Sequence, residues 1–216
     1  MRLDLDCAVT CADGAFGELS DVIIDPGTRR VTHLVVQPAG HHHHHLARLM
    51  PIGRARAGER AKGGVVLDCT VAQVNELHPI HTAEYVRLAD RPAHDADSDV
   101  GIEDEFALPP SELLGAGAMG IGMEPIDVDP HVTVSFDRVP AGTVEIRRDS
   151  AVSSSDGHHV GHVVGFVLDD RAQIARLVLE HGHLWGKREL QIPGGSIDRI
   201  LSDEVVLTLS KDEVGR

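Results

Sequence analysis

The sequence predicts an all-β protein in which two small β-barrels stand in tandem, joined by an acidic, partly disordered linker. Three observations predict this: a long-range internal repeat, short β-branched segments separated by turn sequences, and an acidic charge confined to the middle of the chain. We therefore expect a first barrel at 1–79, a flexible linker at 80–130 and a second barrel at 131–216.

The repeat is visible as a series of segments that match in the same order in both halves. After an Asp-Gly pair, each copy has a glycine, an apolar segment ending in Asp, a second apolar segment, a histidine-bearing loop, a residue followed by proline, and a closing Val-Val-Leu. The matched segments, first copy against second, are 6–14 and 149–157, 17–25 and 161–169, 31–36 and 174–179, 50–51 and 192–193, and 65–67 and 205–207.

Turn chemistry separates these segments. The Asp-Gly pairs at 13–14 and 156–157 suit tight turns, because glycine tolerates a positive φ. Asp25-Pro26-Gly27 places proline at the second position of a turn and glycine behind it. Short strands at such close spacing favour a small barrel, whose interior is filled by side chains such as Val22 and Leu34 and leaves no ligand cavity.

The order of these segments resembles the PRC-barrel family. The resemblance rests on the glycine, Asp21–Asp25, a turn, Val31–Val36, a loop, Met50-Pro51 and the closing Val-Val-Leu, and the second copy around Leu190–Pro193 is closer still. Relatives in this family include the cytoplasmic domain of the photosynthetic reaction-centre H subunit and the C-terminal domain of a ribosome-maturation factor. The resemblance implies a docking module and not an enzyme. From this sequence we expect neither the H subunit's membrane helix nor the maturation factor's separate N-terminal domain.

Composition narrows the class of protein. The formal net charge is −14, and residues 79–144 carry 13 acidic and 3 basic residues, while both ends are nearly neutral. Because both ends are nearly neutral, the basic stripe of a nucleic-acid-binding surface is missing. Aromatic residues make up only 3%, so the residues that stack on bases are scarce as well. No stretch approaches the roughly 20 apolar residues that cross a bilayer, and the N-terminus has no signal-peptide core. Three cysteines, an odd number, indicate a reduced, cytoplasmic protein.

The middle segment divides into a polar part and an apolar part. Residues 90–105 lack large apolar groups and are expected to be disordered. Residues 132–136 alternate like a strand, and Ala141-Gly142 predicts a turn into 143–146. We expect this hairpin to belong to the second barrel.

Histidines form the most conspicuous candidate site. Five consecutive imidazoles guarantee some affinity for Zn²⁺ or Ni²⁺ without making either a cofactor. They belong to His41, His42, His43, His44 and His45. The matching loop of the second copy carries His181 and His183, which alternate and so point to one side of an extended segment. Three interpretations stay open: metal binding or sensing by both loops, a solvated variable loop, and a response to pH near 6.

Other motifs carry less chemistry. Residues 95–99 begin like a calcium loop but lack its glycine and its final glutamate, and 115–120 have dinucleotide-binding spacing without the strand and helix that this requires. Cys7 and Cys11 match Ser150 and Ser154, so a thiol is not common to the two copies. No catalytic constellation emerges, and we expect no enzyme activity and no cofactor.

The sequence therefore favours a non-catalytic protein-binding or scaffold module that docks to a protein partner or self-associates, a homodimer being one arrangement. Trp185, with Leu184 beside it in a predicted loop, is the expected interface anchor, because it is the sole tryptophan. Metal binding through the histidine loops is the first alternative. Ribosome association and a role beside a membrane redox complex follow only from the family resemblance.

Overall fold

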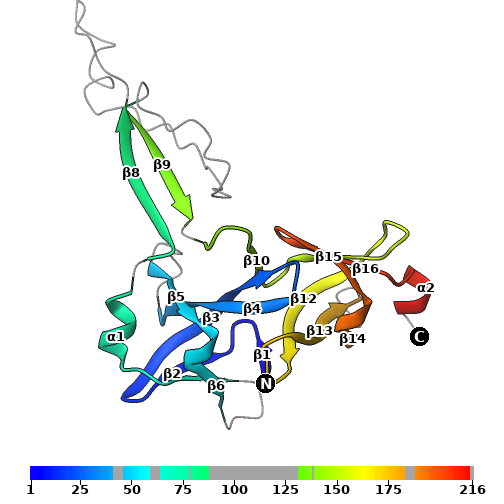
Figure 1. Ribbon diagram of the computed structural model, residues 1–216, viewed down its shortest axis with the longest axis horizontal. Coiled ribbons are helices and arrows are strands. Elements are labelled where there is room, and N and C mark those ends of the chain that lie inside the picture. Colours follow the sequence, from blue (N-terminus) through cyan, green and yellow to red (C-terminus); the bar gives the residue numbers. More distant parts are fainter. Residues whose placement is uncertain are drawn as a thin grey trace, which may run out of the picture.

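The structure is a computed structural model that describes residues 1–40, 46–58, 64–77, 79–87, 131–137, 139–182 and 188–214. It is mostly β and contains two separate mixed sheets, one of them curled into a half-barrel, together with a two-stranded hairpin (Figure 1). The expected β class is confirmed, and the two sheets correspond to the two copies of the repeat. No helix in the described part of the chain is both long and apolar enough to span a bilayer.

The first sheet is built on the N-terminal copy, in the order β5-β4-β3-β2-β7-β6. The 3-10 turn η2 (Ile52–Arg54) links β5 to β6. The strands are β2 (Ala8–Cys11), β3 (Gly14–Asp25), β4 (Arg30–Pro38), β5 (Arg48–Pro51), β6 (Ala55–Ala57) and β7 (Val65–Leu67).

The second sheet repeats this topology with the C-terminal copy, in the order β14-β13-β12-β11-β16-β15. Here η5 (Gly194–Ser196) takes the place of η2. The strands are β11 (Ala151–Ser153), β12 (His159–Leu168), β13 (Ile174–His181), β14 (Arg188–Pro193), β15 (Ile197–Leu201) and β16 (Glu204–Leu207). Each sheet is mixed because one pair, β2 with β7 or β11 with β16, is parallel.

Each sheet takes one strand from the other half of the chain. The N-terminal strand β1 (Arg2–Asp4) pairs with β12, and β10 (Val144–Arg147) pairs with β3. The registers are equivalent under the repeat, since Leu3 lies opposite Phe166 just as Ile146 lies opposite Val22. The two copies therefore form a strand-exchanged pair with approximate two-fold symmetry, which the repeat alone did not reveal.

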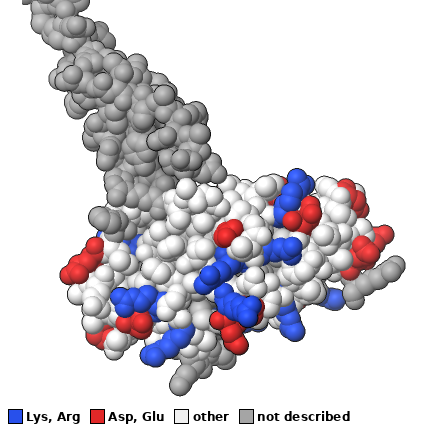
Figure 2. Space-filling view, in the orientation of Figure 1, with Lys and Arg blue, Asp and Glu red and all other residues white. Residues whose placement is uncertain are grey.

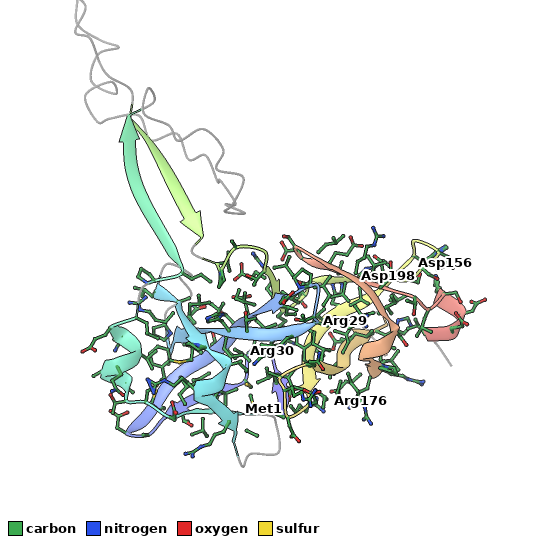
Figure 3. The ribbon with its side chains drawn as sticks, viewed as in Figure 1. Met1, Arg29, Arg30, Asp156, Arg176 and Asp198 are labelled. Atoms are coloured by element: carbon green, nitrogen blue, oxygen red, sulfur yellow. The ribbon has the colours of Figure 1, made fainter. Side chains whose placement is uncertain are left out.

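A second reciprocal contact joins the turns that follow the two long strands. The Val31 amide donates to the Ala172 carbonyl at 2.9 Å, and the Ile174 amide donates to the Arg29 carbonyl at 3.0 Å. The Arg29 guanidinium also donates to the Gly194 carbonyl at 2.8 Å. Figure 3 places Arg29 between the two halves. Arg29 and Ala172 both have positive φ, 54° and 61°, so the same turn shape recurs in both copies.

One hydrophobic cluster runs through both halves. The exchanged residues Leu3 and Ile146 are fully buried in it, together with apolar residues from both sheets. The expected core residues Val22 and Leu34 also belong to this cluster. Because the two large sheets share this core, they pack against each other.

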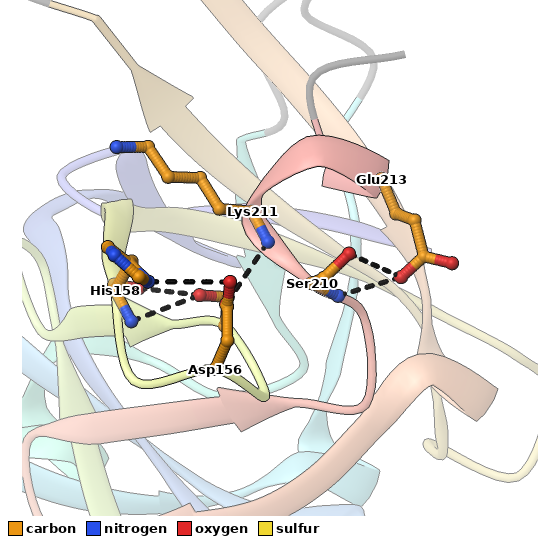
Figure 4. A network of polar contacts seen from close by, with 6 residues as sticks. Asp156, His158, Ser210, Lys211 and Glu213 are labelled. Carbon is orange, nitrogen blue, oxygen red and sulfur yellow. Dashed lines mark hydrogen bonds and ion pairs between the residues drawn. The ribbon is translucent and has the colours of Figure 1, made fainter.

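Each copy ends in a short capped helix that the all-β prediction missed. Thr70 and Gln73 form a capping box on α1 (Val71–Asn75), and Ser210 bonds to Glu213 on α2 (Lys211–Val214). An aspartate from the β-turn caps each helix further. The Val71 amide donates to Asp13 at 2.9 Å and the Lys211 amide to Asp156 at 3.2 Å (Figure 4). The repeat thus continues beyond its Val-Val-Leu.

The prediction that residues 132–136 and 143–146 form a hairpin in the second barrel is wrong. Residues His131–Asp137 form β9, but they pair in antiparallel register with β8 (His81–Arg87), while β10 joins β3 of the first sheet. The local alternation of apolar and polar residues identified both strands, but the strand with which each one pairs is decided by contacts between residues that are distant in the sequence. Residues 88–130, with the expected disorder at 90–105 and the two rejected motifs, lie outside the described residues.

We predict that Gly165→Ala destabilises the protein. A Cβ at Gly165 would lie 2.3 Å from the Leu3 carbonyl oxygen, so β1 must move away from β12. Overpacking of this kind costs about 1–3 kcal/mol. Thermal unfolding compares this variant with Gly195→Ala, where a Cβ meets nothing within 4 Å. Equal melting temperatures for the two variants would contradict the exchange of β1.

A second prediction concerns the cap on α2. Hydrogen bonding to Ser154 and to the Lys211 amide lowers the pKa of Asp156, so its stabilising effect is present above the unfolded pKa and is lost as the pH falls through the folded value. Asp156→Asn should lower the melting temperature at pH 7 and flatten its decline below about pH 4. Asp170→Asn, at an exposed turn position, is the control. An unchanged acid profile in Asp156→Asn would refute the cap.

Candidate functional site

The junction between the two halves holds a polar cleft of about 340 Å³, which we call the junction cleft. It is formed where the exchanged strand β10 lies along β3. Its lining residues are Asp6, Glu18, Ser20, Asp21, Gln37, Arg147 and Arg148.

The floor of the cleft contains buried polar side chains. Asp21 and Gln37 are each only 4% exposed, and Ser20 is 9% exposed. The Ser20 hydroxyl donates to the Val35 carbonyl at 3.2 Å. Asp21 lies directly opposite Arg147 in the β3–β10 register. Burying a carboxylate is costly unless it is paired, and this register brings the strand position of an arginine alongside Asp21.

The rim of the cleft is a set of exposed ion pairs. Arg148 contacts Asp6 at 2.9 Å, and Arg147 contacts Asp203 at 3.0 Å and Glu145 at 3.4 Å. Such half-exposed pairs are worth about 0–1 kcal/mol each, so they add little to stability. Acidic and basic side chains are intermixed over the face seen in Figure 2.

The cleft breaks the symmetry of the fold. The repeat places Gly165 where the first copy has Asp21, and Asp4 and Leu5 where the exchanged strand has Arg147 and Arg148. The same backbone arrangement therefore exists without a buried carboxylate. Because the fold does not require these charges, the junction cleft is a candidate binding site for a charged group.

The described lining of the cleft combines carboxylates, arginines and a hydroxyl, and contains no histidine or cysteine. A second hollow of about 660 Å³, on the first sheet, is lined mostly by small and apolar residues with Arg56 as its one charged group among the residues described there.

The cysteines are buried and poorly reactive. Burial raises the pKa of Cys7 and of Cys11 to about 11, and it also raises the pKa of Cys69, whose thiol is hydrogen-bonded to that of Cys11. The thiolate is the nucleophilic form, so all three are structural in the resting protein.

Of the histidines and aromatics singled out in the sequence, only His181 lies in the described residues. It ends β13, is half-buried, and its Nδ1 bonds to the Val160 carbonyl. The predicted site residues that lie outside the described ranges are His41, His42, His43, His44, His45, His183, Leu184 and Trp185.

Because most of both histidine loops lies outside the described residues, the structure does not test the metal site expected from them, and that site stays a prediction. The same holds for the interface anchor at Trp185. Within the described ranges, no group of three or more His, Cys, Asp or Glu residues could hold a metal ion.

Sequence reasoning missed the junction cleft. One signal was available, since Ser20 and Asp21 precede the apolar run Val22–Ile24 inside a predicted strand where buried polar residues are unusual. The contribution of Arg147 and Arg148 was not predictable, because it depends on the exchange of β10. No model of a known protein family matches the chain, and a search of curated proteins finds no relative.

We predict that native Cys7, Cys11 and Cys69 resist alkylation. A pKa of about 11 leaves roughly 300-fold fewer thiolates at neutral pH than an ordinary thiol of pKa about 8.5. Iodoacetamide at pH 7.5, followed by mass spectrometry, should label no site in minutes, and all three in denaturant. Rapid labelling of any one in the folded protein would show that the thiol is accessible and activated.

Proposed function

We propose that this protein is a non-catalytic scaffold built from two PRC-type β-barrel units, and that it self-associates through the β8–β9 hairpin. The observation that carries this is the isolation of the hairpin. Among the described residues, β8 and β9 pair only with one another, and they form a ribbon that stands away from both large sheets (Figure 1).

The register of the hairpin separates its two faces. Directly opposed residues share a face, and successive pairs alternate between faces. One face therefore has the positions of Thr82, Glu84 and Val86, paired respectively with Phe136, Val134 and Val132. Apolar residues at alternating positions are typical of a strand with one covered face. No other described strand or helix pairs with the ribbon.

An isolated two-stranded hairpin is at best marginally stable in water. Three or more strands with a hydrophobic face are needed for a sheet to be stable by itself. Both outer edges of this ribbon are unpaired within the described residues. Unpaired edges are templates for added strands. Pairing with a second copy would give a four-stranded sheet in which the apolar positions of β9 continue from one copy to the other.

Charge distinguishes the two edges. If β9 pairs antiparallel with β9 of a second copy about Val134, His131 of each copy lies opposite Asp137 of the other, and Val132 lies opposite Phe136. The same operation on β8 about Glu84 places two glutamates opposite one another. The β9 edge is therefore self-complementary, whereas the β8 edge is not.

The other described surfaces are compatible with docking. Leu201 is the one large apolar side chain that is exposed among the residues whose burial the structure describes. The junction cleft supplies a second, polar surface for a charged group of a partner. The PRC-barrel resemblance of each copy favours the same class of function.

The test is the oligomeric state in solution, measured by analytical ultracentrifugation. We expect a dimer, and we expect Val134→Lys to weaken it at least about tenfold, equivalent to about 1.4 kcal/mol, because two lysines would face one another on the two-fold axis. Thr133→Lys, one residue away on the opposite face, is the matched control and should weaken dimerisation less.

A charge test identifies the edge. His131→Asp should weaken the dimer by placing it opposite Asp137 of the second copy, and the double variant with Asp137→His should restore it. A monomeric wild-type protein at high micromolar concentration would refute self-association. A dimer that is indifferent to Val134→Lys would refute the hairpin as its interface.

A further inference from the structure

A pair of histidines outside the junction cleft forms a second candidate site. His159 and His162 lie on β12, with ring centroids 4.6 Å apart and ring planes tilted by 58°. Both residues are exposed, whereas Val160 and Gly161 between them are buried. We call these two residues the histidine pair.

A β-bulge places both rings on one face. Residues three apart in a regular strand point to opposite faces. Here Gly161 lies opposite Val152 while His159 lies opposite Ser153, so the register shifts by one residue between them. The extra residue of the bulge turns the side chains of His159 and His162 to the same face of the strand, so the two imidazoles lie next to each other. The arrangement is part of the backbone and not an accident of two mobile side chains.

The hydrogen bonds of the neighbouring histidines favour ligation through Nε2. His162 Nδ1 lies 2.9 Å from the Asp149 carbonyl oxygen, and His181 Nδ1 contacts the Val160 carbonyl. A carbonyl oxygen can only accept, so each Nδ1 carries the hydrogen and each Nε2 of the neutral ring keeps its lone pair. This backbone support is what orients metal-ligating histidines in proteins.

The surroundings favour a cation. Glu180 lies opposite His162 in the β12–β13 register, and Glu204 accepts a hydrogen bond from Ser153 at 2.6 Å beside His159.

The fold does not require the pair. At the equivalent positions the first copy has Ala15 and Glu18, with the same bulge, since Gly17 lies opposite Val9 and Ala15 opposite Thr10. The backbone thus forms this bulge without histidines. Imidazoles at both positions in one copy only are a local addition to the scaffold, as is the buried carboxylate of the junction cleft.

We propose that His159 and His162 form a two-histidine site for a divalent transition-metal ion, Zn²⁺ or Cu²⁺, with water or an incoming ligand at the remaining positions. Metal–nitrogen bonds of about 2.0–2.1 Å are short enough for two adjacent rings to share one ion after small rotations. Because no larger ligand group exists among the described residues, the ion is exchangeable and not structural. This inference is independent of the docking function.

The test uses the full chain with His41, His42, His43, His44 and His45 replaced by Ser and Gln, which removes the longest run of competing imidazoles. Calorimetric titration with ZnCl₂ and with CuCl₂ should show one site. His159→Gln and His162→Gln should each weaken it at least roughly tenfold, the smallest loss expected even for an outer-shell partner. His158→Gln is the matched control, since this exposed neighbour pairs with Asp156 at 3.4 Å instead.

The symmetry of the fold allows a gain of function. Ala15→His with Glu18→His builds the same pair on the first copy and should raise the stoichiometry from one ion to two. Imidazole NMR signals of His159 and His162 should shift on titration at pH 7.5 and much less at pH 5, where protons compete with the ion for the ring nitrogens. Unchanged affinity in the His159→Gln/His162→Gln double variant, or no NMR shift of these rings at pH 7.5, would overturn the proposal.

Discussion

The structure depends on the reciprocal exchange of β1 and β10 between the two halves. Each short strand extends the sheet of the other copy, and each buries one large apolar residue, Leu3 or Ile146, in the shared core. Neither sheet can be completed by its own half of the chain. This constraint explains why a single hydrophobic cluster crosses the junction.

The shared backbone separates structural from functional residues. Features common to both copies are needed for folding: the positive-φ turns, the close approach of Gly17 and Gly161 to carbonyls of the neighbouring strand, and the capped helices. Features that occur in only one of the two copies are not needed for folding. The clearest differences between the copies are Asp21, which is matched by Gly165, and His159, which is matched by Ala15. In both cases one copy carries an ionisable group on a backbone that the other copy forms without it.

The described part of the protein offers several separate surfaces. Burial keeps the thiols of Cys7 and Cys11 protonated, and exposed ion pairs such as that of Arg148 with Asp6 lie at the rim of the junction cleft. The hairpin has unpaired edges among the described strands, while the junction cleft and the histidine pair occupy the two large sheets. The proposed scaffold function rests on these separate surfaces and not on the fold alone.

The sequence by itself determined the elements that local physics controls. Alternation and turn residues predicted β3, β4, β12 and β13 and core residues such as Val22 and Leu34, and the repeat predicted two equivalent sheets. Only the tertiary structure decided which strands pair across the chain: β8 with β9, β10 with β3, β1 with β12. The exchanged strands pair with residues more than 100 positions away, and such pairing leaves no periodic signal in the sequence. The junction cleft was hidden for the same reason, because Asp21 and Arg147 meet only through the exchanged strand.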